Sequence, residues 1–462
     1  MVPTECGSTR WLRHRRACAA PVCHATGVAK RESQAESDEP TATSPTLDEF
    51  DAVSEDDPNV DPPSDGGGSD DGDADEDDDG GSSLTGSIGS GVGRVVRSQR
   101  TAGIVAGIED RFAKFRRERK IGKGTLRSTY VVAYRGYVGN GRAYTKLRVT
   151  EEPVVPQQAE VLTDPEALRG NLRRFAAMSF PGVDVTVTMA GASDSAETAR
   201  HGYANATIPV ADLVPGWHDY EVRTEPVDPD EEPATARSQV LVPDPAAPFW
   251  VISDIDDTVL QTGLAEGLVA VKNTLFGQAR TRRAVPGMAT LYRAIEGGPA
   301  AAGGARAPFF YISTGPWNLY DMLCEFLRVR GFPAGPMFLT DWGPQERYIS
   351  RSGTQHKRSS LRRLQALYPS AKFVLIGDSG QQDAYNYTDF AEEFPDSVAA
   401  IIIVDVGLDD KAEAMREHEQ AVAGRVPFHY VTDAREAAVV LADKGVIRAE
   451  AVDAVAAAYE RS

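Results

Sequence analysis

Three aspartates lie within four residues in the segment VISDIDDTVL, which spans residues 251–260. Asp254 and Asp256 are two residues apart, and Thr258 follows them. Two neighbouring carboxylates require a cation, or one of them must hold a proton. Mg²⁺ meets the first requirement because it prefers carboxylate oxygens. In phosphoryl transfer, one aspartate can attack phosphorus, while the other protonates the leaving oxygen and later deprotonates water. Taken alone, the motif equally fits a loop or a calcium-type site.

Polar residues further along the chain complete the set of groups that phosphoryl transfer needs. Ser313 ends the apolar run FFYIS, Lys357 lies in TQHKRSSLRRL, and two aspartates lie in FVLIGDSGQQD, namely Asp378 and Asp383. They supply a hydroxyl donor, a cation for the phosphoryl oxygens and further metal ligands. Singly, Lys357 fits a surface lysine at the start of a helix, and Asp383 fits a helix cap. In this order, we interpret them as one site.

Alternating strands and helices must position these groups from residue 248 onward. Continuous apolar strands with crossover helices between them are typical of a parallel α/β sheet. Ligands of such sheets bind at the carboxyl ends of the strands, where these polar residues fall. Gly377 and Gly380 permit close approach of the backbone there. The predicted strands are FWVIS, FFYIS, KFVLIG, AAIIIVDV and FHYVT, with helices in NLYDMLCEFLRVRG and SSLRRLQALYP.

The preceding region, residues 125–247, has a different pattern of residues. Short β-branched or aromatic runs are separated by glycine, proline and aspartate, a spacing that predicts an antiparallel β-sandwich. It holds no tight cluster of catalytic residue types. We therefore expect it to have a positional role or to be a binding module.

The N-terminal part of the chain carries its acidity. The protein has 462 residues and a formal net charge of -19. Residues 31–80 hold 20 acidic residues and one basic residue, so the charges of the remainder balance. We predict a disordered acidic tail over residues 1–94, which is either solubilising or an interaction tail. A basic amphipathic helix is predicted over residues 95–124, packed on the next domain or lying on an anionic membrane.

Cysteine usage and hydropathy indicate the compartment. The four cysteines form no disulfide framework, which favours a reducing environment. The grouping of Cys18, Cys23 and His24 lacks a second ligand pair for structural zinc. No apolar stretch is long enough to span a membrane, and no apolar segment follows the N-terminal arginines as in a secretory signal. We expect a cytoplasmic protein, peripheral to the membrane if its substrate is a lipid.

The order of the motifs resembles the haloacid-dehalogenase-like superfamily: D-x-D-x-T, a strand-end Ser or Thr, Lys, and G-D-x-x-x-x-D. Three longer stretches look like the catalytic domain of the actin-patch-type phosphatidate phosphatase family. They are SDIDDTVLQTG, STGPWNLYDMLCEFLRVRGFPAGPMFLTDWG and HKRSSLRRLQALYPSAKFVLIGDSGQQD. The resemblance spans residues 248–406, with a looser fit on either side, and implies a Rossmannoid parallel sheet in a catalytic domain of residues 248–462. Val404 is a departure, because members of the family often carry a basic residue there.

The resemblance also implies a role for each residue of the site. Asp254 would be the nucleophile that forms an aspartyl-phosphate, Asp256 the general acid and base, and Thr258 a brace for the loop. Relatives that dehalogenate, or that store the phospho-enzyme, lack an acid at the position of Asp256, so its presence favours a phosphatase or phosphomutase. Lys357 would offset the charge of the phosphoryl group and orient Asp254. The implied substrate-binding residues are Ser313, Thr314 and Lys357.

Mg²⁺ is the cofactor that the resemblance implies. It would be held by Asp254, Asp378 and the backbone carbonyl of Asp256, with Asp383 positioning metal-bound water. Asp257 also occurs in the family's form of the motif, and we assign it no chemistry.

The spacing of the motifs bears on the substrate. The gaps between Thr258 and Ser313 and between Ser313 and Lys357 leave no room for a large cap domain. An open site suits a lipid headgroup or a phosphorylated macromolecule. In the first gap a basic group could meet phosphate or anionic lipid, or be a solvated loop: Arg280, Arg282 and Arg283.

The expected function is a Mg²⁺-dependent phosphatase that acts on a lipid phosphate, converting phosphatidate to diacylglycerol. Nothing in the sequence encodes an acyl-chain pocket, so a phosphoprotein or a soluble phosphate ester is the alternative substrate. A non-catalytic membrane-binding scaffold is the third hypothesis, although no catalytic residue named above is missing. We expect no nucleic acid among the partners.

Overall fold

The computed structural model describes residues 128–151, 178–228, 230–260, 284–299, 304–341, 349–407 and 411–462. The predicted acidic tail and the basic helix over residues 95–124 lie outside these ranges, as do the N-terminal cysteines and the arginine group Arg280, Arg282 and Arg283. Much of the first gap between motifs lies outside them too. The predictions for these segments, including the lack of a large cap and the domain boundaries, stay predictions.

Six parallel strands form one sheet in the C-terminal region, in the order β11-β10-β9-β12-β13-β14. β9 comes first along the chain but lies inside the sheet, between β10 and β12. This is the strand order of a doubly wound α/β fold, so the predicted parallel α/β sheet is confirmed. The strands are β9 (Trp250–Asp254), β10 (Phe309–Pro316), β11 (Met337–Thr340), β12 (Phe373–Asp378), β13 (Val398–Val404) and β14 (Phe428–Val431).

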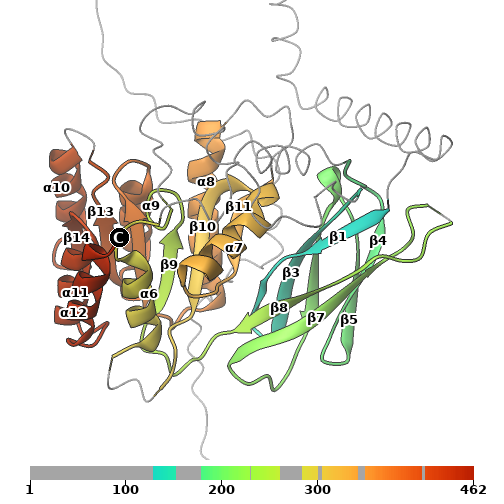
Figure 1. Cartoon of the computed structure of the whole chain (residues 1–462), viewed down its shortest axis with the longest axis horizontal. Helices are drawn as coiled ribbons and strands as arrows, with labels where there is room; N and C mark the ends of the chain where they lie inside the picture. The colour runs from blue at the N-terminus through green and yellow to red at the C-terminus, as the bar shows by residue number, and fades with distance from the viewer. Residues whose placement is uncertain are drawn as a thin grey trace, which may run out of the picture. The chain divides into compact units, whose positions relative to one another are not determined.

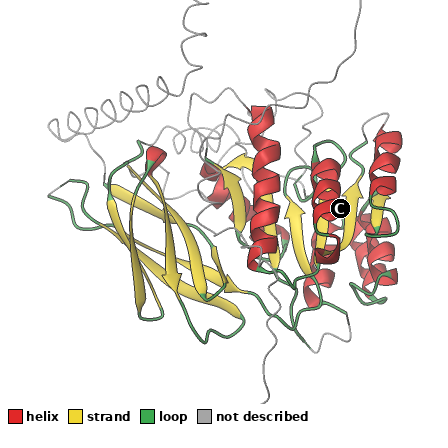
Figure 2. Ribbon diagram, turned by 180° about the vertical axis from the view of Figure 1, so that it is seen from behind, coloured by secondary structure: helices red, strands yellow, loops and turns green. Residues whose placement is uncertain are grey.

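Helices cover both faces of this sheet, as views from opposite sides show (Figure 1 and Figure 2). Strands buried on both faces read as continuous apolar runs, and β9 and β12 are buried along their whole length. The helices are α6 (Met288–Gly297), α7 (Tyr320–Arg330), α8 (Ile349–Leu367), α9 (Asp383–Glu393), α10 (Lys411–Ala421), α11 (Ala434–Asp443) and α12 (Ala451–Glu460), with the 3₁₀ turns η4 (Trp317–Leu319) and η5 (Pro395–Ser397).

β11 is a strand that the sequence interpretation missed. It has only four residues, MFLT, and it follows the proline- and glycine-rich segment FPAGP. The strand pairs with β10 from Tyr311 opposite Met337. A Cβ at Gly335 would lie 2.3 Å from the carbonyl oxygen of Phe309, so glycine lets the segment approach β10. The partner strand, rather than a pattern of its own, defines β11.

The region before the α/β sheet is built of strands joined in an eight-stranded sheet. Its order is β1-β3-β2-β8-β7-β4-β5, with β6 beside β3. The pairs are antiparallel except for β2 with β8. The strands are β1 (Thr129–Ala133), β2 (Gly136–Gly139), β3 (Arg142–Glu151), β4 (Asp184–Met189), β5 (Ala192–Glu197), β6 (Tyr203–Pro209), β7 (Gly216–Thr224) and β8 (Thr235–Val242), with the short turn η1 (Arg200–Gly202).

This region has a core of its own. β4 alternates exposed and buried residues, which places Val185 and Val187 against buried side chains such as Leu147 and Ile208. The strand-rich character matches the prediction. The arrangement as a two-layer sandwich stays a prediction, because hydrogen bonds join all eight strands into one sheet.

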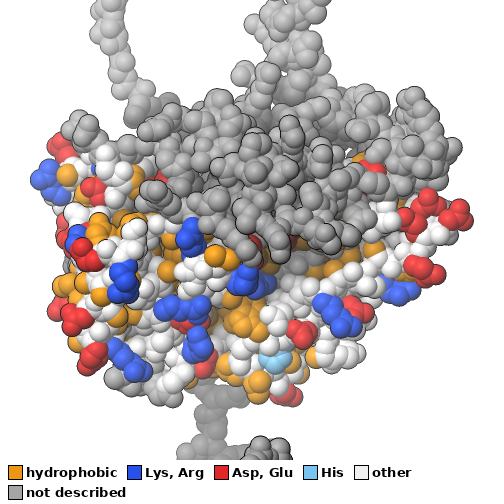
Figure 3. Space-filling model, viewed as in Figure 1, with side chains coloured by type: hydrophobic (Ala, Val, Ile, Leu, Met, Phe, Trp, Pro, Cys, Tyr) orange, Lys and Arg blue, Asp and Glu red, His pale blue; other side chains and the backbone are white. Residues whose placement is uncertain are grey.

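The described surface carries both signs of charge. Acidic and basic side chains are interspersed on the face seen in Figure 3. This agrees with the balance of charges outside residues 31–80. Among the described helices, none has the length and apolar character needed to cross a membrane.

Candidate active site

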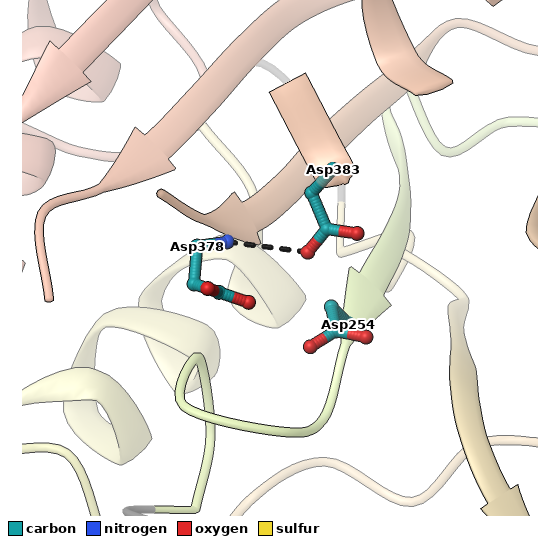
Figure 4. A group of neighbouring side chains, drawn as sticks. All are labelled: Asp254, Asp378 and Asp383. Atoms are coloured by element: carbon teal, nitrogen blue, oxygen red, sulfur yellow. Dashed lines mark hydrogen bonds between the residues drawn. The ribbon is translucent and has the colours of Figure 1, made fainter. Parts of the chain in front are cut away.

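Asp254 and Asp378 end two neighbouring strands, β9 and β12. The chain leaves β9 to build β10 on one side and returns to build β12 on the other. The carboxyl ends of β9 and β12 therefore flank the switch point of the sheet, where open α/β sheets bind their ligands. Figure 4 shows Asp254 at the end of its strand, beside Asp378 and Asp383.

Three buried carboxylates meet at this switch point. Asp254, Asp378 and Asp383 are fully buried, and one carboxylate oxygen of each lies within 4.8 Å of the others. Oδ2 of Asp383 accepts a hydrogen bond from the Asp378 backbone amide at 3.2 Å (Figure 4). A Cβ at Gly377 would lie 2.6 Å from the side chain of Asp383. The close approach predicted at Gly377 is therefore confirmed, because a larger residue at this position of β12 would displace the side chain of Asp383.

Lys357 supplies an ammonium group to these carboxylates. Its Nζ lies 2.7 Å from Oδ1 of Asp254 and 2.5 Å from Oδ1 of Asp383. The prediction that Lys357 lies at a helix start is wrong, because α8 begins at Ile349 and Lys357 lies in its interior. The early turns of α8 contain the polar sequence SRSGTQ, which carries no apolar periodicity to signal a helix. The lysine therefore projects from a fixed helical backbone.

The pKa shifts of the buried groups indicate that the site is short of positive charge. Burial raises the pKa of Asp254 well above its usual value, and the charge of Asp383 adds to this, against the effect of Lys357. Burial, followed by the charge of Asp383, raises the pKa of Asp378 to about 8. Burial by itself lowers the pKa of Lys357, but Asp254 and Asp383 raise it above its usual value. Among the described residues, one ammonium group pairs with two of these three buried carboxylates, those of Asp254 and Asp383.

The oxygens of Asp254 fit a metal ion. Both are buried; Oδ1 lies 2.7 Å from the Lys357 ammonium, whereas Oδ2 has no hydrogen-bond partner among the described residues. A buried carboxylate oxygen without a donor is costly. A hard divalent cation with oxygen ligands, such as Mg²⁺, would remove that cost. Asp254, Asp378 and Asp383 together form a group suited to hold it.

Asp256 is oriented by the next strand. Oγ of Ser313, within β10, donates a hydrogen bond to Oδ2 of Asp256 at 2.7 Å. The backbone amide of Gly315 in turn donates to Oγ of Ser313 at 2.9 Å. Both side chains are buried. A carboxyl group held in this way, two residues after Asp254, has the fixed position that a general acid and base needs.

Thr258 and Thr314 lie on the two segments that bear these groups. Thr258 is fully buried, and its hydroxyl has no hydrogen-bond partner among the described residues. The role of Thr258 as a brace for the loop stays a prediction. If it has that role, Thr258 would hold the loop through the packing of its buried side chain and not through a hydrogen bond. The carbonyl oxygen of Thr314 accepts a hydrogen bond from Oγ1 of Thr340 at 2.9 Å. A Cβ at Gly353 would lie 3.0 Å from Cγ2 of Thr314, so α8 packs closely on this segment.

Three polar residues beside the site were missed by the sequence interpretation. Oγ of Ser253 donates to the carbonyl oxygen of Asp254 at 2.6 Å and lies 2.7 Å from the hydroxyl of Tyr292. Gln381 donates from Nε2 to Oδ2 of Asp378 at 3.1 Å. Ser253 is adjacent to Asp254, and Gln381 lies between two predicted site residues, so proximity in sequence was an available signal. Tyr292 lies on α6 and offered no signal of this kind.

Asp257 now has a structural explanation. Its φ angle is +55°, in the left-handed region that few residues other than glycine adopt. Asp and Asn tolerate this region better than other side chains. The backbone amide of Asp257 donates to the carbonyl oxygen of Leu260 at 2.8 Å, which closes a tight turn. The turn reverses the chain directly after Asp256.

A substitution series at Asp257 separates this conformation from any chemistry of the carboxylate. The expected phosphatase activity of Asp257→Asn and Asp257→Gly should stay within about threefold of the wild type, because asparagine and glycine both accept a left-handed backbone. Asp257→Val should lower the free energy of unfolding by about 1–3 kcal/mol and reduce kcat, since a β-branched residue resists this conformation. Steady-state kinetics and urea unfolding measure the two effects. A large loss of activity in Asp257→Asn with unchanged stability would instead assign chemistry to the carboxylate.

The fold and the site define the class. The C-terminal region is a doubly wound α/β domain with paired carboxylates and a lysine at its switch point. Residues 249–405 match the family model described as "Phosphatidate phosphatase APP1, catalytic domain", so this region of the chain is similar to that catalytic domain. The resemblance that the sequence motifs indicated over residues 248–406 is confirmed.

Two curated relatives extend the comparison. Phosphatidate phosphatase APP1 of Saccharomyces cerevisiae is 25% identical over 252 residues, covering 52% of this chain and 41% of the relative. An uncharacterized protein of Schizosaccharomyces pombe is 30% identical over 157 residues, covering 34% of this chain and 25% of the relative. The chain thus spans less than half the length of these relatives. A solved structure, a carbohydrate acetylesterase from Xanthomonas citri, aligns over 54% of this chain and 70% of its own, with 11% identity and a TM-score of 0.21.

Proposed function

We propose that this protein is a phosphoric monoester hydrolase of haloacid-dehalogenase-like type that cleaves a lipid phosphate, converting phosphatidate to diacylglycerol with Mg²⁺ as cofactor. One observation carries the proposal. Asp254 is buried with one carboxylate oxygen, Oδ2, that has no hydrogen-bond partner among the described residues, and it lies beside Lys357 and two residues before Asp256. This is the arrangement of a nucleophile paired with an acid and base. The family match of residues 249–405 supports the same reaction.

In the first step, a carboxylate oxygen of Asp254 attacks phosphorus and forms an acyl-phosphate bond. The bond between phosphorus and the ester oxygen breaks as Asp256 gives that oxygen a proton, so diacylglycerol leaves as a neutral alcohol. Ser313 holds the Asp256 carboxyl group during this transfer. Lys357 holds Asp254 through its ion pair and adds positive charge next to the incoming phosphoryl group.

In the second step, water attacks the phosphorus of the aspartyl-phosphate. Asp256, now a carboxylate, takes a proton from that water. The bond between phosphorus and the Asp254 oxygen breaks, and inorganic phosphate leaves. Asp254 returns to its carboxylate form, and Asp256 again holds the proton needed for the next cycle.

Mg²⁺ would be held by Asp254, Asp378 and the backbone carbonyl of Asp256, with Asp383 placing its bound water. When bound, it supplies the positive charge that the three buried carboxylates lack and offsets the charge of the phosphoryl oxygens. A phosphatidate headgroup remains at the surface of the bilayer, so we also propose that the protein binds peripherally to a membrane.

Phosphate release from phosphatidylcholine vesicles that contain phosphatidate tests the proposal. We expect release in the presence of MgCl₂ and none with EDTA. A panel with a phosphoserine peptide and p-nitrophenyl phosphate, matched in concentration, tests the substrate class. Higher kcat/KM for the vesicles supports a lipid phosphate. A strong preference for either soluble substrate would replace the lipid but keep the chemistry, and no release from any member would leave the scaffold hypothesis.

A further inference from the structure

Gln381 contacts two of the oxygens that the proposed function assigns to Mg²⁺. Its side-chain Nε2 lies 3.1 Å from Oδ2 of Asp378 and 3.3 Å from the backbone carbonyl oxygen of Asp256. An amide nitrogen carries two hydrogens, so it can donate to both oxygens at once. Gln381 therefore links the loop after β9 to the loop after β12.

The carboxylate of Asp378 is held from both ends. The backbone amides of Gly380 and Gln381 donate to Oδ1 at 2.6 Å and 3.0 Å. The side chain of Gln381 donates to Oδ2. With Oδ1 saturated by two backbone donors, Oδ2 keeps a lone pair for another partner. The Gln381 side chain thus acts with the two backbone amides to hold the orientation of the available oxygen of Asp378.

Two features fix the direction of the Asp256 carbonyl group, a backbone turn and a hydrogen bond. The left-handed backbone of Asp257 turns the chain directly after it, and the amide of Gln381 donates to its oxygen. A carbonyl oxygen has two lone pairs, so it can accept this hydrogen bond and still ligate a cation. Groups that hydrogen-bond to metal ligands fix their direction and often change metal affinity by about 10–100-fold.

We propose that Gln381 is a positioning residue of the metal site, which holds the Asp256 carbonyl and the Asp378 carboxylate in the directions that Mg²⁺ requires. The inference rests on the proposed function for the identity of the cation. It adds a residue that contacts no substrate and supplies no ligand atom. Its contribution is to affinity for the metal and not to the chemical step.

The neighbouring residue provides a matched control. Gln382 has the same side chain, but it is exposed, and it makes no side-chain cap to α9. We would prepare Gln381→Met, which keeps the length of the side chain and removes both donors, and Gln382→Met as its control. Gln381→Asn retains the amide but is one methylene too short to reach both oxygens, and it serves if Gln381→Met does not fold.

The readout is Mg²⁺ affinity of the full chain, measured by titration calorimetry and by the shift of the unfolding midpoint with MgCl₂. We expect the Kd for Mg²⁺ to rise about 10–100-fold in Gln381→Met, less in Gln381→Asn, and not at all in Gln382→Met. With saturating MgCl₂, kcat should return to within about threefold of the wild type. An unchanged Kd in both Gln381 variants would overturn the proposal, and a lower Kd would show that the amide competes with the ion.

The outcomes also separate this inference from the proposed function. Wild-type protein that binds Mg²⁺, together with unaffected Gln381 variants, overturns the role of Gln381 alone. Wild-type protein that binds no Mg²⁺ overturns both the role of Gln381 and the cofactor in the proposed function. If Gln381→Met binds Mg²⁺ more weakly but the wild-type protein releases no phosphate from any substrate, the role of Gln381 in the metal site is supported and the proposed phosphatase activity is overturned.

Discussion

Replacing Asp254 with asparagine is expected to reduce phosphate release by about 10⁴-fold or more, since the amide cannot act as the nucleophile. The same change should raise the unfolding midpoint in EDTA. Asp254 is buried, and burial together with the charge of Asp383 raises its pKa. A group with a raised folded-state pKa loses its contribution to stability as the pH rises through that pKa. The amide therefore removes a carboxyl group whose ionised form is disfavoured in the folded protein.

A surface aspartate gives the control for this substitution. Asp389 pairs with Arg358 at 3.2 Å, and both side chains are partly exposed. Exposed ion pairs contribute little to stability, so Asp389→Asn should leave both the rate and the unfolding midpoint nearly unchanged. Retention of more than a tenth of the activity in Asp254→Asn would exclude Asp254 as the nucleophile. A lower midpoint in EDTA would contradict the account of its charge.

Replacing Lys357 with methionine should have the largest effect on stability. The change removes the ammonium ion that pairs with Asp254 and Asp383, and no other described Lys, Arg or His forms an ion pair with them. Breaking one side of a buried pair costs about 3–5 kcal/mol, because a buried charge is left without compensation. We expect a loss of this size in the free energy of unfolding at pH 8 in EDTA, with greatly reduced activity.

The pH dependence of this loss identifies its cause. Burial, followed by the charge of Asp383, raises the pKa of Asp254, so lower pH neutralises a carboxylate that the variant leaves without its ammonium partner. Urea unfolding should therefore show a smaller loss at pH 5 than at pH 8. Lys372→Met, at an exposed lysine, is the control. A loss that is equal at both pH values would point to packing of the long side chain instead of its charge.

The double variant tests whether the two groups act as a pair. Asp254→Asn should recover part of the stability that Lys357→Met loses, because it removes one of the two carboxylates left without a cation. Residues in direct contact deviate from additivity, and these two atoms are 2.7 Å apart. Strict additivity of the two changes would contradict the ion pair as the source of the effect.

The strand ends were predictable because they depend on local pattern. Apolar runs marked β9, β10 and β12, and parallel sheets place their ligands at the carboxyl ends of such strands. This placed Asp254 and Asp378 correctly at the ends of β9 and β12, whereas Ser313, predicted at a strand end, lies within β10, which continues to Pro316. The order of the motifs along the chain then joined them to Lys357, although its place inside α8 was missed because the first turns of that helix are polar.

Other features depend on contacts between distant segments and left no local signal. β11 is a strand because β10 lies beside it, and Tyr292 meets Ser253 only after α6 has packed on the sheet. Gln381 reaches the carbonyl of Asp256 across the switch point. A glutamine in a loop is ordinarily a solvated side chain, so its type carried no information about this contact.

The position of β9 has a consequence for synthesis on the ribosome. This strand is made first among the six, yet its inner neighbour β12 emerges only after β10, β11 and α8. Until then, one edge of β9 has no partner, and an unpaired apolar edge invites pairing with other chains. The growing polypeptide therefore carries its aspartates beside an open edge for most of the translation of this domain. Pairing of this edge with other chains during biosynthesis is a hazard that this topology creates.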